Sequence, residues 1–399
     1  MSYSFFNERL AATKQANRFR RPLQTDNNVG REIIINGQRY LNFSSNDYLG
    51  LASHPDIKNA FKQGIDEYGT GSGSASLISG YSKAHAYLQS QLSDWLGFGD
   101  TLLFSSGFAA NTGTLQALGH KDSLYLLDKL SHASLIDGAF LSNAKSRRFL
   151  HNDPQSLDKY LQASSSIDNT IIVEGVYSMD GDKANISETY QLSRKHNAHL
   201  YIDDAHGIGV LANDGSGSLH AASIVNKRNV VQMVTFGKAI GTQGAAICAG
   251  DDVIEYLRNY CREYIYSTAI PAALARATSK SIEICQSEAW RREKLIILTT
   301  LFKLKLDTSI EVTQSDSAII GVLCGSEADA LACQQALFAK GIFVKAIRPP
   351  TVEPGKCRLR VTLTANHTEA DVCTLALNIN EVFGEIQNRA TINGNDNGQ

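Results

Sequence analysis

The sequence predicts an α/β protein with a large, mainly parallel, seven-stranded sheet domain and a smaller C-terminal α+β domain. The first observation is that short runs rich in Val, Ile and Leu alternate with amphipathic stretches between residues 101 and 248. The second is a change of pattern after Pro271. The third is the length of 399 residues, which corresponds to two or three domains at roughly 150 residues each. Near-continuous apolar strands separated by helices are typical of a parallel sheet that is buried on both faces.

The large domain is expected over residues 50–270. Its predicted strands are Thr101–Phe104, Leu124–Leu127, Arg147–Leu150, Thr170–Glu174, His199–Ile202, Val230–Val234 and Ala245–Cys248. Helical segments between them include Phe108–Leu118, His132–Asn143 and Ile186–His196. This alternation of strand and helix places the carboxyl ends of the parallel strands at one edge of the sheet, which is where open α/β sheets bind ligands.

The remaining segments flank this domain. An N-terminal segment, 1–49, contains a predicted helix at Phe5–Phe19 that docks on the body or on a partner subunit. Residues 271–388 form the predicted small domain, with a helical stretch to about residue 304 and then alternating elements. Its strands are expected at Ala318–Leu323, Ile342–Val344 and Arg358–Leu363, and its helices at Glu327–Lys340 and His367–Phe383. The Asn- and Gly-rich tail, 389–399, is predicted to be disordered.

Composition excludes several classes of protein. The formal net charge of -2 gives no indication of nucleic-acid or anionic-membrane binding. No apolar run approaches the roughly 20 residues of a spanning helix, and Met1–Arg20 does not resemble a secretion leader. The seven cysteines contain no CxxC pair, which argues against a disulfide framework or a zinc site. We therefore expect a cytoplasmic globular protein without a metal.

Charged residues follow the strand that ends near Ile202. Asp203 and Asp204 lead into the turn that holds His206 and two glycines. A buried carboxylate is costly unless it is paired, and its partner could be a Lys or Arg, a metal, or a protonated pyridine nitrogen. The alternative is an aspartate that only caps the next turn, which the unit DDAHGIG makes less favourable.

Lys238 follows the strand Val230–Val234 and lies between small and apolar residues. Desolvation disfavours the ammonium form of a lysine. A lysine must lose this proton before it can form a Schiff base. Most loop lysines are simply solvated, but the neighbouring Thr235 and the DDAH segment one strand earlier favour the catalytic interpretation.

Two further segments also follow predicted strands. Gly107 opens a helix after Thr101–Phe104, and free N–H groups at such a position favour a phosphate. The run Gly69–Gly73 lacks the GK[ST] of a P-loop. His132 opens a helix four residues after Asp128, where a histidine is usually a cap but is also placed to stack on an aromatic ring.

Six motifs together resemble the α-oxoamine synthase family, which are fold-type-I pyridoxal-phosphate enzymes related to the aminotransferases. They are NFSSNDYLGL (42–51), SGFAAN (106–111), SHASLIDG (131–138), EGVYSMDGD (174–182), DDAHGIGV (203–210) and TFGKAIG (235–241). The resemblance runs from about residue 15 to 385 and implies the fold of the aspartate aminotransferases. It implies pyridoxal 5'-phosphate as the cofactor.

The resemblance implies catalytic roles for residues around the cofactor ring. Lys238 carries the cofactor covalently and later acts as base at the substrate Cα. Asp203 pairs with the pyridinium nitrogen, and His132 stacks on the ring and faces the substrate. His206 and Ser178 face the phenolic oxygen.

Phosphate binding is also implied by resemblance. Gly107, Phe108 and Thr235 hold the phosphate. Ser267 and Thr268 resemble the segment that reaches the phosphate of the neighbouring subunit. A homodimer with shared active sites follows from that likeness.

On the substrate side, Asn46 and Arg360 match residues that hold the amino-acid carboxylate, a group that a planar guanidinium binds well. Arg358 lies on the same strand face and stays a candidate. Arg20 and Thr351 match positions near the acyl substrate. The family's GSGGSR pattern is GSGSAS at 71–76 here, which leaves the acyl-chain preference open.

Three segments most resemble the family member of the biotin pathway: HND (151–153), YIYSTAIP (264–271) and AIRPPTVEPGKCRLRVTLTANH (346–367). That likeness implies decarboxylative condensation of L-alanine with a pimeloyl thioester of coenzyme A or acyl carrier protein. The alternatives are another member of the family that acylates glycine or serine, a plain aminotransferase, and a cofactor-binding module without turnover. The shared catalytic residues do not discriminate among the family members.

Overall fold

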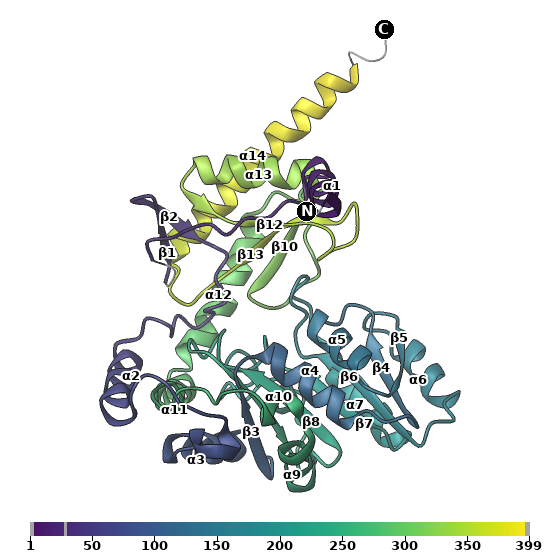
Figure 1. Ribbon diagram of the computed structural model, residues 1–399. Helices are drawn as coiled ribbons and strands as arrows, with labels where there is room; N and C mark the ends of the chain where they lie inside the picture. The colour runs from purple at the N-terminus through teal and green to yellow at the C-terminus, as the bar shows by residue number, and fades with distance from the viewer. Residues whose placement is uncertain (1–3, 28–29, 396–399) are drawn as a thin grey trace. The chain divides into compact units, whose positions relative to one another are not determined.

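The computed structural model describes residues 4–27 and 30–395 (Figure 1). Contacts divide the chain into two compact units. The catalytic unit, as we call it, comprises residues 49–178 and 183–292. The small unit comprises residues 1–48, 179–182 and 293–399.

A seven-stranded sheet in the order β3-β9-β8-β7-β6-β4-β5 forms the centre of the catalytic unit (Figure 1). Its strands are β3 (Asp100–Phe104), β4 (Ser123–Asp128), β5 (Lys145–Phe149), β6 (Asp168–Glu174), β7 (His199–Asp203), β8 (Val230–Thr235) and β9 (Ala245–Ala249). Only β9 runs antiparallel to its neighbours β3 and β8. The predicted fold class, a mainly parallel α/β sheet, is confirmed.

Both faces of this sheet are buried. Alternate side chains of β4 enter different apolar clusters: Tyr125 and Leu127 belong to one, Leu124 and Leu126 to the other. A strand covered on both sides needs apolar residues at every position, which explains the continuous runs in the sequence. The helices of this unit are α2 (Pro55–Tyr68), the π-helix η1 (Ser76–Gly80), α3 (Lys83–Leu96), α4 (Gly107–Leu118), α5 (Ala133–Leu141), α6 (Pro154–Gln162), α7 (Ile186–Lys195), α8 (Ser218–Ala221), α9 (Asp251–Tyr260), α10 (Arg262–Ile265) and α11 (Ala272–Ser287).

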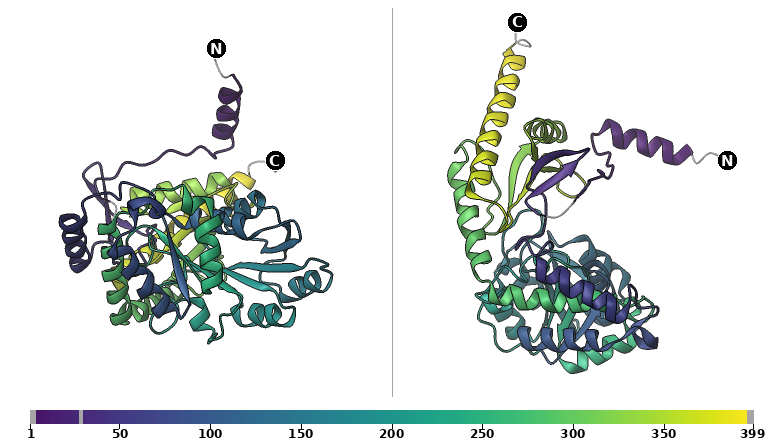
Figure 2. Two further views of the ribbon diagram at one scale, coloured as in Figure 1. Left: turned by 60° about the horizontal axis from the view of Figure 1, so that its bottom comes forward. Right: turned by 90° about the vertical axis from the view of Figure 1, so that its left-hand side faces the viewer.

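The small unit contains two three-stranded sheets, β1-β2-β11 and β10-β13-β12. Their strands are β1 (Glu32–Ile35), β2 (Gln38–Asn42), β10 (Ile319–Gly325), β11 (Ile342–Phe343), β12 (Lys345–Ile347) and β13 (Cys357–Thr362). The helices are α1 (Ser4–Gln15), α12 (Trp290–Lys305), α13 (Glu327–Ala339) and α14 (Glu369–Asn395). In both views of Figure 2, α1 extends away from the strands of its own unit. Phe5, Phe6 and Leu10 on α1 are exposed.

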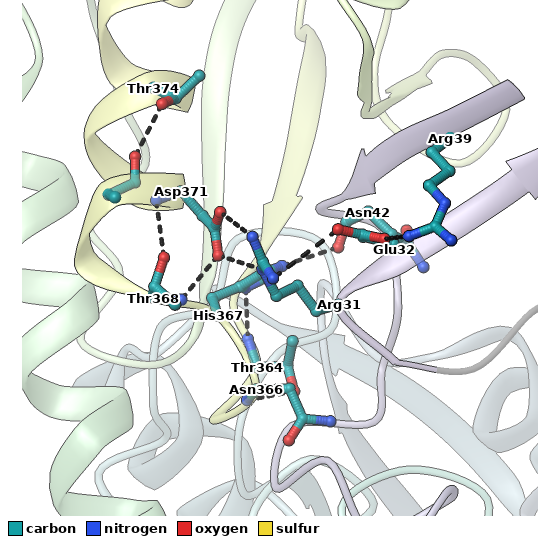
Figure 3. Close-up of polar contacts among 11 residues, drawn as sticks. Arg31, Glu32, Arg39, Asn42, Thr364, Asn366, His367, Thr368, Asp371 and Thr374 are labelled. Atoms are coloured by element: carbon teal, nitrogen blue, oxygen red, sulfur yellow. Dashed lines mark hydrogen bonds and ion pairs between the residues drawn. The ribbon is translucent and has the colours of Figure 1, made fainter.

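Polar residues tie the N-terminal strands of the small unit to its C-terminal helix (Figure 3). Arg31 donates to both carboxylate oxygens of Asp371, at 2.6 and 2.9 Å. His367 accepts from the Thr364 N–H through Nδ1 at 3.1 Å and reaches the Asn42 carbonyl through Nε2 at 3.0 Å. Burial lowers the pKa of His367 to about 4, so this ring is neutral at neutral pH and serves as a structural link.

The structure differs from the predicted domain boundaries in two places. The predicted boundary at residue 271 lies instead after Arg292, because α11 packs against α2 and α3 of the catalytic unit. The segment 1–49 does not stand apart, because β2 pairs with β11 and so belongs to the small unit.

The predicted tail also differs. The helix α14 continues to Asn395, so residues 389–395 are helical rather than disordered, and 396–399 lie outside the described residues. No proline interrupts the end of α14, and each residue that extends an existing helix adds a hydrogen bond. In the described ranges, each helix is too short or too polar to cross a lipid bilayer.

Candidate active site

Four predicted site segments meet at the carboxyl edge of the parallel strands in the catalytic unit. Strand register places Glu174 of β6 opposite Asp203 of β7, and Asp203 opposite Met233 of β8. Thr235 ends β8, and Lys238 lies in the turn after it, beyond Phe236 and Gly237. The shared edge therefore concentrates ionisable side chains from neighbouring strands, as the sequence predicts.

Lys238 contacts His206 directly. Lys238 Nζ lies 2.6 Å from His206 Nε2. The residues around the lysine, Phe236 and Ala239, are almost completely buried, at 1% and 0% exposure. Gly241 adopts a φ of 68° and returns its N–H to the Lys238 carbonyl at 2.9 Å, which turns the chain tightly around the lysine. The residues next to Lys238 in the chain are thus buried, and its amine lies beside the His206 imidazole.

The Asp203 carboxylate has a hydrogen bond to each oxygen. Asn111 Nδ2 donates to Oδ2 at 2.7 Å, and the Ala205 N–H donates to Oδ1 at 3.0 Å. The opposite end of the Asn111 amide accepts from the Tyr201 hydroxyl at 2.7 Å. Because a carboxylate only accepts, this chain of bonds determines which way the amide of Asn111 points.

The same amide reaches His132 through Ser134. Asn111 Nδ2 also donates to Ser134 Oγ at 2.9 Å, and this hydroxyl lies 2.8 Å from His132 Nδ1. The Ser134 N–H donates to His132 Nδ1 at 3.2 Å. Nδ1 is therefore the acceptor, and the proton of the neutral ring is on Nε2. Burial, opposed by Asp203, lowers the pKa of His132, which keeps the ring neutral at neutral pH.

Glu174 lies beneath this group and is 2% exposed. It accepts from the His132 N–H at 2.6 Å. Burial, and then the nearby charge of Asp203, raises the pKa of Glu174 well above its ordinary value.

The second aspartate of the motif has a structural role. Asp204 Oδ2 accepts from the Ser218 N–H at 2.8 Å, at the start of α8, and from Gln232 at 2.7 Å. A Cβ atom added at Gly207 would lie 1.9 Å from Asp204 Oδ1. The glycine after His206 is thus required by the close approach of this buried carboxyl. The carboxylate that accepts from the next turn is Asp203, through the Ala205 N–H, whereas Asp204 binds groups further along the chain. The pairing of Asp203 with a cation stays a prediction.

The first turn of α4 supplies donors for a phosphate. Ser106 caps the helix by accepting from the Ala109 N–H at 3.2 Å. The N–H groups of Gly107 and Phe108 make no hydrogen bond among the described residues. A Cβ added at Gly107 would lie 3.6 Å from Thr235 Cβ, so the helix start and the end of β8 are neighbours. Unsatisfied N–H groups beside a threonine hydroxyl suit an anion.

Pyridoxal phosphate fits this group of residues. Lys238 offers an amine, Asp203 a buried anion, and the start of α4 a phosphate seat. Phe108 and His132 supply aromatic rings whose centroids are 6.4 Å apart in an edge arrangement. Within residues 4–27 and 30–395, no group of three or more His, Cys, Asp or Glu residues is placed to hold a metal ion.

Other predicted cofactor residues lie elsewhere in the catalytic unit. Ser267 and Thr268 line a small enclosed cavity together with Ser105. The glycine-rich loop is fastened to the same segment, because Ser72 Oγ donates to the Ala269 carbonyl at 2.6 Å. Ser178 lies shortly after the end of β6, and it is the last residue of the stretch 49–178 of the catalytic unit.

The predicted carboxylate-binding residues meet in the small unit. Arg360 donates to Asn46 Oδ1 at 3.0 Å, and the Tyr48 hydroxyl donates to the same oxygen at 3.2 Å. Arg360 is 9% exposed. Its neighbour Arg358 forms an ion pair with Asp180, which gives that arginine a structural role. The strand thus carries two buried guanidinium groups with different partners.

The predicted acyl-side residues also lie in the small unit. Arg20 NH2 lies 3.3 Å from the Arg348 carbonyl and 3.2 Å from that of Pro349. The Thr351 N–H donates to the Arg348 carbonyl at 3.2 Å. Arg20 and Thr351 therefore both contact the same turn, which follows β12.

Three residues of the catalytic network had no role in the sequence analysis: Asn111, Ser134 and Glu174. All lie inside the recognised motifs, at SGFAAN, SHASLIDG and EGVYSMDGD. The sequence feature that could have identified them is a polar residue among apolar or small residues. Its meaning depends on partners that are distant in sequence, such as Asp203 for Asn111.

Comparison with known proteins supports the likeness across both units. Residues 38–379 match the family described as aminotransferase class I and II. The 8-amino-7-oxononanoate synthase of Photobacterium profundum is 44% identical over 359 residues, which cover 89% of this chain and 91% of the relative. The structure of 8-amino-7-oxononanoate synthase from Francisella tularensis superposes with a TM-score of 0.75 at 28% identity, covering 88% and 99% of the two chains. A serine palmitoyltransferase variant from S. paucimobilis with bound PLP gives a TM-score of 0.89 at 27% identity, covering 96% and 98%.

Proposed function

The chain belongs to the aminotransferase class I and II family and, within it, to the 8-amino-7-oxononanoate synthases, and from this premise we propose that it joins L-alanine to a pimeloyl thioester. It is a pyridoxal-phosphate-dependent acyltransferase. The reaction forms a bond between the alanine Cα and the acyl carbon, releases CO2 and the thiol, and gives 8-amino-7-oxononanoate for biotin synthesis. The observation that carries this proposal is 44% identity over 89% of the chain.

The cofactor supplies an acceptor for the electron pair released at the substrate Cα. Asp203 would keep the pyridine nitrogen protonated, because its buried negative charge stabilises a cation there. Asn111 and the Ala205 N–H fix the direction of that carboxylate. Gly107, Phe108 and Thr235 would hold the phosphate at the start of α4.

Lys238 would carry the cofactor and then move the Cα proton. Its 2.6 Å contact with His206 Nε2 supplies a neighbour that can share this proton. His132 would lie against the cofactor ring and present its Nε2–H toward the substrate. Its neutral ring stacks without bringing a second positive charge close to Lys238.

Substrate recognition is proposed for residues of the small unit. Arg360, with its orientation fixed by Asn46, would bind the alanine carboxylate through its planar guanidinium. Arg20 and Thr351 would contact the acyl substrate. Ser267 and Thr268 would complete the phosphate site of the partner subunit in a homodimer.

A second candidate within the family is acylation of serine, as in serine palmitoyltransferase. It is favoured by the higher TM-score of 0.89, against 0.75 for the F. tularensis synthase. The fold is common to both activities, whereas 44% identity to a curated synthase exceeds 27% to the palmitoyltransferase. Identity therefore weighs more than superposition in choosing the substrate.

The test is a direct comparison of amino-acid and thioester pairs. The purified holoenzyme is mixed with pimeloyl-CoA and either L-alanine, glycine or L-serine, and free thiol and product mass are measured. We expect thiol release and 8-amino-7-oxononanoate with alanine alone. Product from serine or glycine instead of alanine would retain the family and overturn the substrate.

A homodimer and a cytoplasmic location are part of the proposal. The exposed side chains of Phe5, Phe6 and Leu10 on α1 offer an apolar surface that a second subunit would cover. All seven cysteines are free, which suits a reducing compartment. Light scattering after gel filtration tests the first expectation, and cell fractionation tests the second.

A further inference from the structure

A histidine–aspartate pair lies in the catalytic unit, beside the segment that carries His132. Asp128 ends β4 and is 0% exposed, and His151 lies in the turn after β5. His151 Nδ1 lies 2.8 Å from Asp128 Oδ1. Since an ionised carboxylate only accepts, Nδ1 carries a proton and the direction of the imidazole ring is fixed. Neither residue of this pair belongs to the cofactor site proposed above.

Asp128 also sets the path of the chain that leads to His132. Its Oδ1 accepts from the Leu130 N–H at 2.8 Å, and its carbonyl accepts from the Ser131 N–H at 3.1 Å. Burial alone would raise the pKa of Asp128, but the hydrogen bond and charge of His151, with two backbone N–H groups, lower this pKa below its ordinary value. The carboxylate therefore stays ionised and stabilises the tight turn in front of His132.

The ring of His151 also contacts the segment that carries Ser178. It lies edge-on to the Tyr177 ring, with centroids 4.5 Å apart and an interplanar angle of 87°. Tyr177 is 1% exposed and directly precedes Ser178 in the chain. Because edge-to-face packing of aromatic rings has a preferred geometry, this contact restricts the path of the chain after β6.

Asn152 holds the same segment through hydrogen bonds. Its N–H donates to Asp128 Oδ2 at 3.0 Å, and its side-chain amide donates to the Lys183 carbonyl at 3.1 Å. Lys183 in turn forms an antiparallel bridge with Val176, two residues before Ser178. The turn after β5 therefore reaches this segment by a polar route as well as through an aromatic ring.

These contacts form a closed cycle. The His132 N–H donates to Glu174 at 2.6 Å, and the chain runs on from Glu174 to Tyr177. Tyr177 contacts the His151 ring. His151 contacts Asp128, from which the chain returns to His132. In such a cycle each contact restricts the others, so the segments after β4 and after β6 are positioned together.

We propose that His151 is a positioning residue that holds both His132 and Ser178 at the cofactor. It acts through its hydrogen bond to Asp128 and its ring contact with Tyr177. The inference rests on the proposed roles of His132 at the cofactor ring and of Ser178 at the phenolic oxygen. Groups around a reacting centre must stay within about 0.5 Å of their working geometry, so support of this kind affects the rate.

Hydrogen exchange tests the positioning without catalysis. His151→Leu removes both contacts, and amide exchange of the holoenzyme, measured by mass spectrometry, should become about tenfold faster in peptides that cover 129–138 and 174–178. His151→Asn keeps a donor for the carboxylate but lacks the ring, so exchange should become faster at 174–178 only. His196→Leu is the matched control, because His196 Nε2 lies 2.6 Å from Asp158 in the same unit but outside this cycle.

Spectra and kinetics separate positioning from a simple loss of stability. In His151→Leu, the visible absorbance of the bound cofactor should titrate with a shifted apparent pKa, and kcat with alanine and pimeloyl-CoA should fall about tenfold. KM for alanine should change little, because Asn46 and Arg360 belong to the small unit. His151→Asn should recover part of kcat, since it restores the donor to Asp128.

Native exchange and a native cofactor titration in His151→Leu, or changes equal to those in His196→Leu, would overturn the proposal. If His151→Leu does not fold, His151→Asn carries the test, because native exchange at 174–178 in that variant would contradict the role of the ring contact. A native protein that forms no product from alanine would instead contradict the proposed function. Exchange and absorbance need no thioester, so the two failures are distinguishable.

Discussion

Two regions around the end of β7 contain adjacent buried carboxylates with different surroundings. Asp203 accepts from a side-chain amide that continues to Tyr201, Ser134 and His132. Asp204 accepts from the Ser218 N–H and is closely surrounded by glycines. The first carboxylate is connected through Asn111 and Ser134 to His132, which we propose lies against the cofactor ring. The second accepts from the Ser218 N–H and from the Gln232 side chain on β8, so it holds the start of α8 to the sheet.

Partners, rather than burial, separate the two roles. Asp203 is 5% exposed and Asp204 0%. For Asp204, burial is opposed by only a few donors, and its Oδ1 is buried without a hydrogen-bond partner. Burial raises the pKa of Asp204 to about 6. Asp203 is thus distinguished by a side-chain network that reaches His132, and Asp204 by how closely the glycine backbone surrounds it.

The largest expected effect comes from removing the charge of Asp203. Asp203→Asn keeps the shape and can still accept from Asn111, so the cofactor should still bind. Turnover should fall about 10³-fold, equivalent to roughly 4 kcal/mol of barrier, because a neutral amide does not keep the pyridine nitrogen protonated. Steady-state thiol release and the visible absorbance of the bound cofactor measure both quantities. Near-normal turnover would refute the assignment.

The corresponding change at Asp204 should alter the pH dependence of stability. The folded pKa of about 6 lies above the ordinary value of 3.8. Protonation therefore favours the folded state, and this contribution is fully present below about pH 4 and lost as pH rises through about 6. The loss amounts to about 3 kcal/mol. Asp204→Asn has no such titration.

Urea unfolding of the holoenzyme measures this difference. The unfolding free energy of the native protein, relative to Asp204→Asn, should decrease by about 3 kcal/mol between about pH 4 and pH 7. Other titrating groups cancel in the difference, provided that they do not contact Asp204. A constant difference across this range would show that burial does not shift this carboxyl.

Much of this comparison could be predicted from sequence, and part of it could not. The strand ends and the DDAHGIG unit placed Asp203, His206 and Lys238 near each other, because a parallel sheet collects its carboxyl ends at one edge. The different roles of Asp203 and Asp204 came only from the family resemblance and not from the local pattern, because they depend on Ser218 and Asn111, which are 14 and 92 residues away. Local pattern carries no information about such partners.

The same limit applies to the small unit. Arg358 and Arg360 alternate on one strand and appear equivalent in sequence. Only the fold brings Asp180 to Arg358, across 178 residues. The long helix α14 continues through a segment whose Asn and Gly content predicted disorder. Composition is a weak guide there because a helix that is already formed needs little local preference to continue.

The smallest expected effect tests whether the Asp203 region acts as one network. Asn111→Leu removes the donor to Asp203 and Ser134 at similar volume, and turnover should fall about tenfold, with loss of the fixed His132 tautomer. Tyr201→Phe removes only the outermost bond, and its effect on turnover should be smaller, with about 1 kcal/mol lost in unfolding free energy. The pH titration of the cofactor absorbance separates positioning from simple destabilisation, because only the former changes the apparent pKa of the bound cofactor. The shift should be larger in Asn111→Leu than in Tyr201→Phe, since Asn111 contacts Asp203 directly and Tyr201 acts through it. Equal shifts in both variants, or none, would mean that the Ala205 N–H is enough to orient the Asp203 carboxylate and that its side-chain network does not distinguish it from Asp204.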